Sequence, residues 1–237
     1  MADRFPRLRL FVAARLSREG AAGLHLTLGL LLMMATAWLF GALAKDVVEG
    51  SAITVLDAEL AQRLHRHSAG LTRAMLLITN LHDPLIICLM ALGLAVYFYR
   101  HKARHWLLAL VLVVPGGLLL NVMLKYIFRR ARPSFDDPLL TLATYSFPSG
   151  HTAGAALLYG FVAAYLVTNA RSLALRIGAV AVACTMVALV GLSRMVLGAH
   201  YLSDVVAGTL EALCWLAICI TSVSSLRRRQ GTARHGA

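Results

Sequence analysis

Gly23 to Ala44, GLHLTLGLLLMMATAWLFGALA, is the first long apolar run of the chain and contains no charged residue. An α-helix needs about 20 mainly apolar residues to cross the hydrocarbon core of a bilayer, and this run is long enough. It is too long for the core of a signal peptide, and no convincing small-residue cleavage site accompanies it. We therefore predict that this run is a retained transmembrane helix.

The rest of the chain has the same apolar character. Of its 237 residues, 59% are hydrophobic and only 14% are charged, which is typical of membrane proteins. The pattern predicts an all-α polytopic membrane protein with six transmembrane helices. The five further spans run approximately over Asp83 to Tyr99, Trp106 to Tyr126, His151 to Val167, Ile177 to Leu192 and Val205 to Val223.

The segment between the first two spans is more polar. Helical periodicity over Val55 to His65 predicts a short amphipathic helix outside the bilayer core. Pro84 lacks a backbone donor, so we expect a kink or a helix start there. His82 and Asp83 would then lie at the outer end of the second span. Asp83 is explained either by this helix start or by contact with a substrate.

The distribution of charge divides the chain into three parts: a basic N-terminal arm (1–22), a six-helix membrane domain (23–223) and a basic tail (224–237). The arm is either an interfacial helix or a topology signal. The larger share of the 23 lysines and arginines lies on the same side of the predicted spans as the termini. The positive-inside rule therefore places both termini in the cytoplasm.

The net charge of +12 raises the possibility of a nucleic-acid binder. The basic residues, however, occupy short loops on both sides of the predicted membrane domain rather than one stripe, which argues against that class. The cysteines all fall inside apolar runs without metal-ligand spacing, so we expect neither a disulfide nor a metal site. They are Cys88, Cys184, Cys214 and Cys219.

Three polar segments interrupt the apolar chain on the predicted outer side. The first, KYIFRRARP, runs from Lys125 to Pro133. Lys125 and Arg132 are two helical turns apart, so both point from one face while the helix persists. Pro133 then favours a helix end at Arg132. The alternative is a basic cluster that only fixes topology, and we assign Arg129 and Arg130 to it.

The second polar segment, FPSGH, runs from Phe147 to His151. Ser149 is a good N-cap for the span that follows, and helix N-terminal amides bind anions. Gly150 lets the backbone approach a phosphate closely. His151 adds a titratable ring to the same turn, which favours a functional site over a simple helix start.

The third polar segment, SRMVLGAHYLSD, runs from Ser193 to Asp204. Asp204 lies one helical turn beyond His200, so its carboxylate can hold one ring nitrogen while the other remains free for attack. Arg194 offers a planar fork suited to phosphate oxygens. His200 is our candidate nucleophile. Ionisable groups near membrane helix ends are costly without partners, which again favours function.

The three segments together resemble the three-part signature of the type 2 phosphatidic acid phosphatase superfamily. The resemblance covers Lys125 to Asp204 and implies that His200 forms a phosphohistidine, that Asp204 fixes its tautomer and that His151 serves as general acid and base. It further implies phosphate binding without a metal ion or other cofactor. The implied phosphate ligands are Lys125, Arg132, Ser149, Gly150 and Arg194.

The resemblance implies a lipid phosphatase in the cytoplasmic membrane of a bacterium, with its site facing outward. The expected substrate is an isoprenoid diphosphate, such as undecaprenyl diphosphate, or a glycerolipid phosphate. One alternative is a phosphotransferase that passes the phosphoryl group to a lipid or sugar acceptor. Another is an anionic-lipid transporter or flippase, which would need neither histidine. The long apolar spans argue against the vanadate haloperoxidases that share this signature.

Overall fold

A computed structural model describes residues 23–65, 68–135, 142 and 144–235 of the chain, and every regular element in these residues is an α-helix. The predicted all-α class is confirmed, whereas the basic arm 1–22 lies outside the described residues. The eight helices are α2 (Leu24–Glu49), α3 (Ala52–His65), α4 (Ala69–Leu81), α5 (Pro84–Arg100), α6 (Arg104–Phe128), α7 (Gly150–Asn169), α8 (Leu173–Val196) and α9 (Leu202–His235).

Five of these helices are long and apolar enough to cross a membrane: α2, α6, α7, α8 and α9. A sixth span is possible only if α4 and α5, which meet at an angle of 47°, are counted together. The predicted helix start at Pro84 is confirmed, and the Asp83 side chain caps α5 by accepting from the Leu85 amide at 2.9 Å. The predictions did not include α4 as a separate helix.

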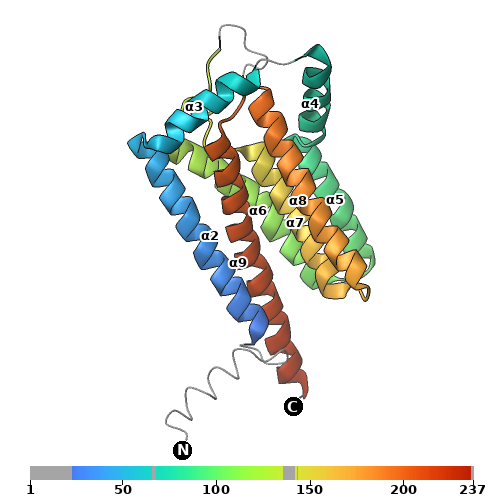
Figure 1. The fold of residues 1–237 in the computed structure, drawn as a ribbon. Coiled ribbons are helices and arrows are strands. Elements are labelled where there is room, and N and C mark those ends of the chain that lie inside the picture. Colours follow the sequence, from blue (N-terminus) through green and yellow to red (C-terminus); the bar gives the residue numbers. More distant parts are fainter. Residues whose placement is uncertain (1–22, 66–67, 136–141, 143, 236–237) are drawn as a thin grey trace, which may run out of the picture.

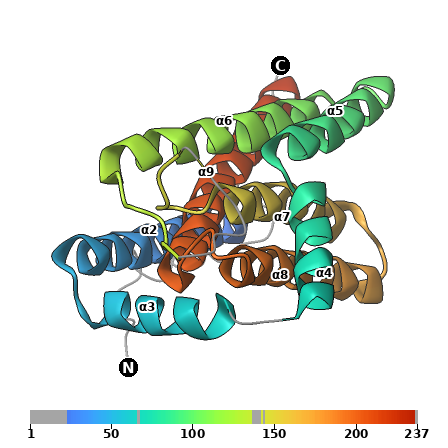
Figure 2. The same ribbon diagram turned by 90° about the horizontal axis from the view of Figure 1, so that it is seen from above.

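The helices form a bundle with α7 near its centre (Figures 1 and 2). Half of the most apolar 18-residue stretch of α7 is buried within the bundle. The corresponding share is only 6% for α2 and for α8. Helix α2 packs along α9 at one side of the bundle. The predicted amphipathic helix is α3, which lies across one end of the bundle and contacts α2, α8 and α9. The start of α2 and the end of α9 lie at the opposite end.

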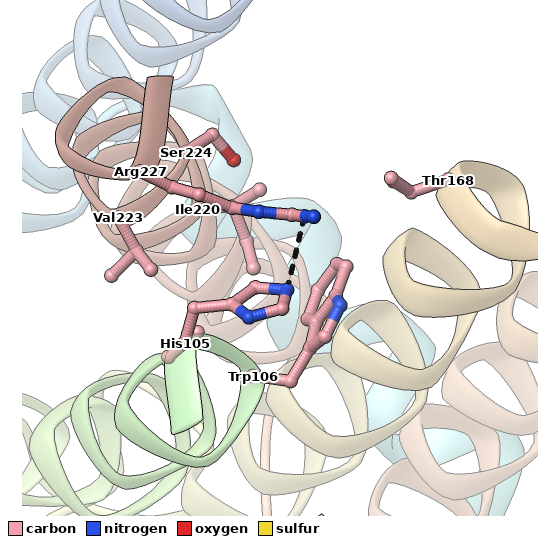
Figure 3. Close-up of a pocket in the computed structure, with 8 residues that line it drawn as sticks. His105, Trp106, Thr168, Ile220, Val223, Ser224 and Arg227 are labelled. Carbon is pink, nitrogen blue, oxygen red and sulfur yellow. Dashed lines mark hydrogen bonds between the residues drawn. The ribbon is translucent and has the colours of Figure 1, made fainter. Parts of the chain in front are cut away.

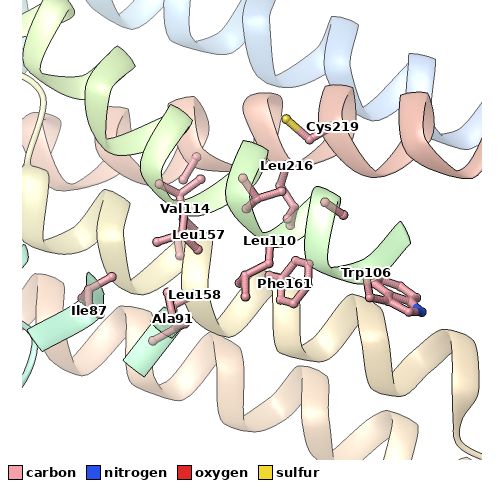
Figure 4. Close-up of a cluster of buried hydrophobic side chains, with 14 of the residues drawn as sticks. Ile87, Ala91, Trp106, Leu110, Val114, Leu157, Leu158, Phe161, Leu216 and Cys219 are labelled. Carbon is pink, nitrogen blue, oxygen red and sulfur yellow. The ribbon is translucent and has the colours of Figure 1, made fainter. Parts of the chain in front are cut away.

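The main core joins α5, α6, α7 and α9 (Figure 4). Ile87, Val113, Leu157 and Phe161 are fully buried there. A Cβ added at Gly117 would come within 2.5 Å of Leu157, so small residues allow the close helix packing expected in a bilayer. Large apolar side chains on the outside of the bundle, such as Trp38 at 72% exposure, suit a lipid surface.

This packing brings the three polar segments to one end of the bundle, near α3. The first segment spans the end of α6, the second begins α7, and the third runs from the end of α8 into the start of α9. The contacts of α7 with α6, α8 and α9 hold these ends next to one another.

Candidate active site

A cavity of about 240 Å³ lies where the three polar segments meet. Six of the eight predicted site residues line it. Ser149 and Asp204 do not line it and are fully buried. The six are Lys125, Arg132, Gly150, His151, Arg194 and His200, and apolar or polar neighbours complete the wall, among them Pro84, Leu118, Asn121 and Thr144.

His200 lies in the short connection between α8 and α9 and is only 2% exposed. Gly198, with a φ of 67°, makes the turn that leads into it. Nδ1 of His200 lies 3.4 Å from Oδ2 of Asp204, and Nε2 lies 3.2 Å from Nη1 of Arg132. Burial lowers the pKa of His200 to about 3, and Asp204 only partly opposes this. The ring is therefore neutral at physiological pH, with Nε2 directed towards a cation.

Asp204 is fully buried at the start of α9. Its Oδ2 accepts hydrogen bonds from the Tyr201 amide at 2.9 Å and from the Ser146 hydroxyl. Its Oδ1 accepts from Nη1 of Arg130 at 2.6 Å. Both carboxylate oxygens are thus held by donors other than His200, which fixes the carboxylate against the imidazole ring.

Arg130 was predicted to be a topology residue, and that assignment is wrong. Its guanidinium is largely buried, with 13% exposure, and pairs with Asp204 at 2.6 Å and with Asp57 of α3 at 2.7 Å. Burial alone would lower the pKa of Arg130, but the two carboxylates raise it. No sequence pattern indicated this contact, because Asp57 lies on a distant helix. Arg129 instead ends α6 in a left-handed conformation and bonds to the Tyr126 carbonyl.

Each of the three cations that line the cavity is held by neutral oxygens. Lys125 Nζ donates to the Tyr145 carbonyl at 2.8 Å. Arg132 Nη1 donates to the Ala199 carbonyl at 2.7 Å. Arg194 Nη1 donates to Thr79 Oγ1 at 2.7 Å. No described residue within 4.0 Å offers any of these cations a carboxylate, so the cavity keeps a positive charge.

Arg194 also carries an unsatisfied donor. Its side chain is 2% exposed, and its Nε has no hydrogen-bond partner among the described residues. Buried guanidinium nitrogens are almost always paired in folded proteins. An unpaired, charged donor at the wall of a cavity therefore suits an anionic ligand.

The second polar segment forms the N-terminus of α7, as predicted. Ser149 occupies the N-cap position, although its side chain makes no capping bond and its hydroxyl instead lies 3.0 Å from Thr152 Oγ1. The Ser149 amide donates to the Asp204 carbonyl at 2.9 Å, which ties the second segment to the third. A Cβ at Gly150 would lie 3.0 Å from Asn121 Oδ1, so a larger residue would require the Asn121 side chain to move slightly.

His82 and Asp83, the two residues before Pro84, differ in their relation to the cavity: Asp83 lies close to a lining residue, His151, whereas the ring of His82 bonds to residues that do not line the cavity. His151 lines it, and Nε2 of His151 lies 3.9 Å from Oδ2 of Asp83. Asp83 is therefore both a helix cap and a neighbour of His151. His82 does not line the cavity. Its ring bonds to the Ile78 carbonyl and to the Tyr159 hydroxyl, which indicates a packing role.

A larger cavity, of about 380 Å³, lies at the other end of the bundle (Figure 3). Arg227 and His105 lie 3.1 Å apart at its edge, beside Trp106. None of the predicted site residues lines it. The chemistry expected from the sequence therefore belongs to the smaller cavity. In the described part of the chain, no three His, Cys, Asp or Glu side chains are grouped as a metal site would require.

Comparisons with known proteins point to one family. A family model described as the PAP2 superfamily matches residues 104–228. Phosphatidylglycerophosphatase B of Bacillus subtilis is 39% identical over 127 residues. That match spans 53% of this chain and 59% of the relative, which is less than two thirds of the relative's length.

Two solved structures have a similar fold. The crystal structure of a transmembrane PAP2-type phosphatidylglycerolphosphate phosphatase from Bacillus subtilis superimposes with a TM-score of 0.72 at 28% identity, and covers 79% of this chain and 94% of that one. Aquifex aeolicus LpxE superimposes with a TM-score of 0.55 at 22% identity, and covers 70% of this chain and 94% of that one. The second likeness concerns the fold alone.

Proposed function

Because this chain belongs to the PAP2 superfamily, we propose that it is a membrane lipid phosphatase that hydrolyses a phosphate or diphosphate monoester of a lipid. The observation that carries the proposal is the placement of His200. Its Nδ1 faces a fixed carboxylate, and its Nε2 faces a cavity lined by Lys125, Arg132 and Arg194. A neutral imidazole held in this way is a nucleophile, and the cations are positioned to bind the group that it attacks.

The first step transfers the phosphoryl group to the enzyme. Nε2 of His200 attacks phosphorus and forms an N–P bond, while the bond from phosphorus to the lipid oxygen breaks in line with it. His151, whose charged form would face the Asp83 carboxylate 3.9 Å from Nε2, gives its proton to the departing oxygen. Asp204 holds the Nδ1 proton and stabilises the positive ring of the phosphohistidine.

The second step releases phosphate. His151, now neutral, takes a proton from a water molecule, whose oxygen attacks phosphorus and breaks the N–P bond. In both steps the charge on the non-bridging oxygens is balanced by the three cations, with the Gly150 amide as a further donor. Ser149, which the sequence also suggested as a phosphate ligand, does not line the cavity and serves as the N-cap residue of α7. No metal ion has a role in this scheme, because the cations supply the charge.

The relatives and the position of the site support one substrate class. The B. subtilis relative is a phosphatidylglycerophosphatase, which favours a glycerolipid phosphate over an isoprenoid diphosphate. The cavity lies at one end of the bundle, where the phosphate of a lipid could enter from the membrane edge. With both termini cytoplasmic, as the positive-inside rule predicts, this end faces the exterior of a bacterial inner membrane.

The test is phosphate release by the purified protein in detergent with chelator present. The substrates are phosphatidylglycerophosphate, undecaprenyl diphosphate, phosphatidic acid and a soluble phosphate ester. We expect release from one lipid, and a loss of about 10³-fold or more in His200→Ala. His101→Ala is the matched control, because His101 is an exposed histidine at the end of α5. Equal activity of His200→Ala and wild type would overturn the proposal.

Two other outcomes identify the alternatives. Phosphate transfer that appears only when a lipid or sugar acceptor is added would indicate a phosphotransferase. Movement of an anionic lipid across reconstituted vesicles that persists in His200→Ala would indicate a transporter.

A further inference from the structure

Asp57 is a buried charge on a helix that otherwise behaves as a surface helix. The nearby Glu59 and Arg63 of α3 are exposed and pair with one another, with their side chains 59% and 79% accessible. Asp57 is 0% exposed. A buried carboxylate is costly unless it is paired and hydrogen-bonded, so its partners indicate what it holds.

The partners of Asp57 come from the first and third polar segments. Oδ2 accepts from Nη2 of Arg130 at 2.7 Å. Oδ1 accepts from the Ser203 amide at 3.0 Å, and the Ser203 hydroxyl donates to Oδ2. Ser203 lies in the first turn of α9, where backbone amides lack partners within the helix. Asp57 therefore caps α9 from another helix, and its negative charge also interacts favourably with the positive end of the α9 dipole.

Arg130 connects this cap to Asp204. One guanidinium nitrogen donates both to Oδ1 of Asp204, at 2.6 Å, and to the Ser203 hydroxyl, at 2.7 Å. The guanidinium also lies over the ring of Tyr201, 4.3 Å from its centroid. Tyr201 directly follows His200. Arg130 thus contacts Tyr201, Ser203 and Asp204, which follow the candidate nucleophile His200 in the chain, and leaves Nε2 of His200 facing the cavity.

We propose that Asp57 and Arg130 are positioning residues that hold Asp204, and through it the ring of His200, so that helix α3 is part of the catalytic apparatus. This inference rests on the proposed function of His200 as nucleophile. Without Asp57, Arg130 has one carboxylate partner in place of two, and the first turn of α9 loses its cap. Both changes loosen Asp204 while leaving the cations that line the cavity in place.

The kinetic test compares Asp57→Asn with Glu59→Gln, which neutralises an exposed carboxylate of the same helix. In metal sites, the outer partners that orient the ligands contribute about 10- to 100-fold to affinity or activity, and we take the same range for the groups that orient His200. We expect kcat of Asp57→Asn to fall by roughly this factor, with KM changed less than about twofold because the cations are retained. Asp57→Glu should recover part of the loss. A kcat for Asp57→Asn equal to that of Glu59→Gln would overturn the inference.

A second measurement does not depend on activity. In ¹⁵N-histidine NMR spectra, the His200 resonances can be assigned from their absence in His200→Gln. Wild type should show one tautomer, protonated at Nδ1, and Asp57→Asn should show a mixture. Unchanged His200 resonances in Asp57→Asn would refute the positioning role. If wild type releases no phosphate but the tautomer shift is seen, the proposed function fails and the coupling of Asp57 to His200 stands.

Discussion

A single methyl group added at Gly208 of α9 should damage the site, although Gly208 does not line the cavity. A Cβ added at Gly208 would lie 2.5 Å from the carbonyl oxygen of Ser149 and 3.3 Å from its carbonyl carbon and amide nitrogen. All three atoms belong to the backbone of the second polar segment, so no side-chain rotation can relieve the contact. The substitution Gly208→Ala must therefore move Ser149 away from α9.

The size of the effect follows from this distance. Ordinary contacts of a Cβ begin near 3.4 Å, so the two backbones must separate by about 1 Å, and a misplacement of that size can cost about 10²-fold in rate. The Ser149 amide also bonds to the Asp204 carbonyl, and this bond would be stretched. We expect kcat to fall about 10²-fold. Alanine is favoured over glycine within a helix by roughly 0.5–1 kcal/mol, which offsets part of the loss in stability.

The assay is phosphate release from the preferred lipid, together with the melting temperature in the same detergent. Gly178→Ala is the matched control, because Gly178 lies within α8 and a Cβ there meets nothing within 4 Å. Gly178→Ala should keep full activity and a melting temperature at least equal to that of wild type. Full activity in Gly208→Ala would show that the reasoning about the second polar segment is wrong.

Three further predictions concern charge. Glu211 is buried and accepts a hydrogen bond from Asn121 at 2.8 Å, while its other oxygen has no partner among the described residues. Glu211→Gln should therefore keep or raise the melting temperature, because it removes the buried charge. Glu211→Ala should lower the melting temperature, because it leaves Asn121 unpaired. Because burial lowers the pKa of His200 from 6.5 to about 3, the unfolded chain takes up this proton first as the pH falls below 6.5. Keeping this ring neutral therefore lowers the free energy of unfolding by up to about 1.4 kcal/mol for each pH unit below 6.5. Between pH 6.5 and about 4 the melting temperature should fall less steeply for His200→Gln than for wild type. Phosphate release should be unchanged by chelator, and activity lost in chelator and restored by a divalent ion would contradict the metal-free scheme.

The membrane helices were the part of the fold that the sequence predicted best, because hydropathy depends only on local composition. The predicted span Trp106 to Tyr126 corresponds to α6 (Arg104–Phe128), and four of the other spans differ mainly at their ends. The exception is the predicted span Asp83 to Tyr99, because α5 qualifies as a span only together with α4. Those ends depend on caps and turns. Lys125 and Arg132 were expected to share one helical face, but α6 ends at Phe128 because Arg129 adopts a left-handed conformation with a φ of 48°. Arg132 therefore reaches the cavity from a loop.

The spacing of the three polar segments predicted which residues gather at the cavity, but it could not predict how the buried charges are balanced. That balance depends on tertiary contacts such as the one between Asp57 and Arg130, which join distant parts of the chain and follow no periodic pattern. The predicted topology role of Arg130 failed for this reason. Nothing in a run of adjacent arginines distinguishes the one that turns inward.

The charge balance explains why the cavity suits a phosphate. Asp57 and Asp204 are fully buried carboxylates close to the cavity, and Arg130 pairs with both of them. If Asp204 were free to pair with Arg132 instead, the cavity would lose a cation and His200 would lose its orienting partner. Because Arg130 engages both carboxylates, the acceptors that the described residues offer to the cations lining the cavity are neutral ones, namely carbonyl and hydroxyl oxygens and the His200 ring. Three cations that line one cavity repel one another. An anion that enters the cavity is therefore stabilised both by direct contact with the cations and by the relief of their repulsion. A phosphate carries enough negative charge to contact the cations directly and to relieve the repulsion among them.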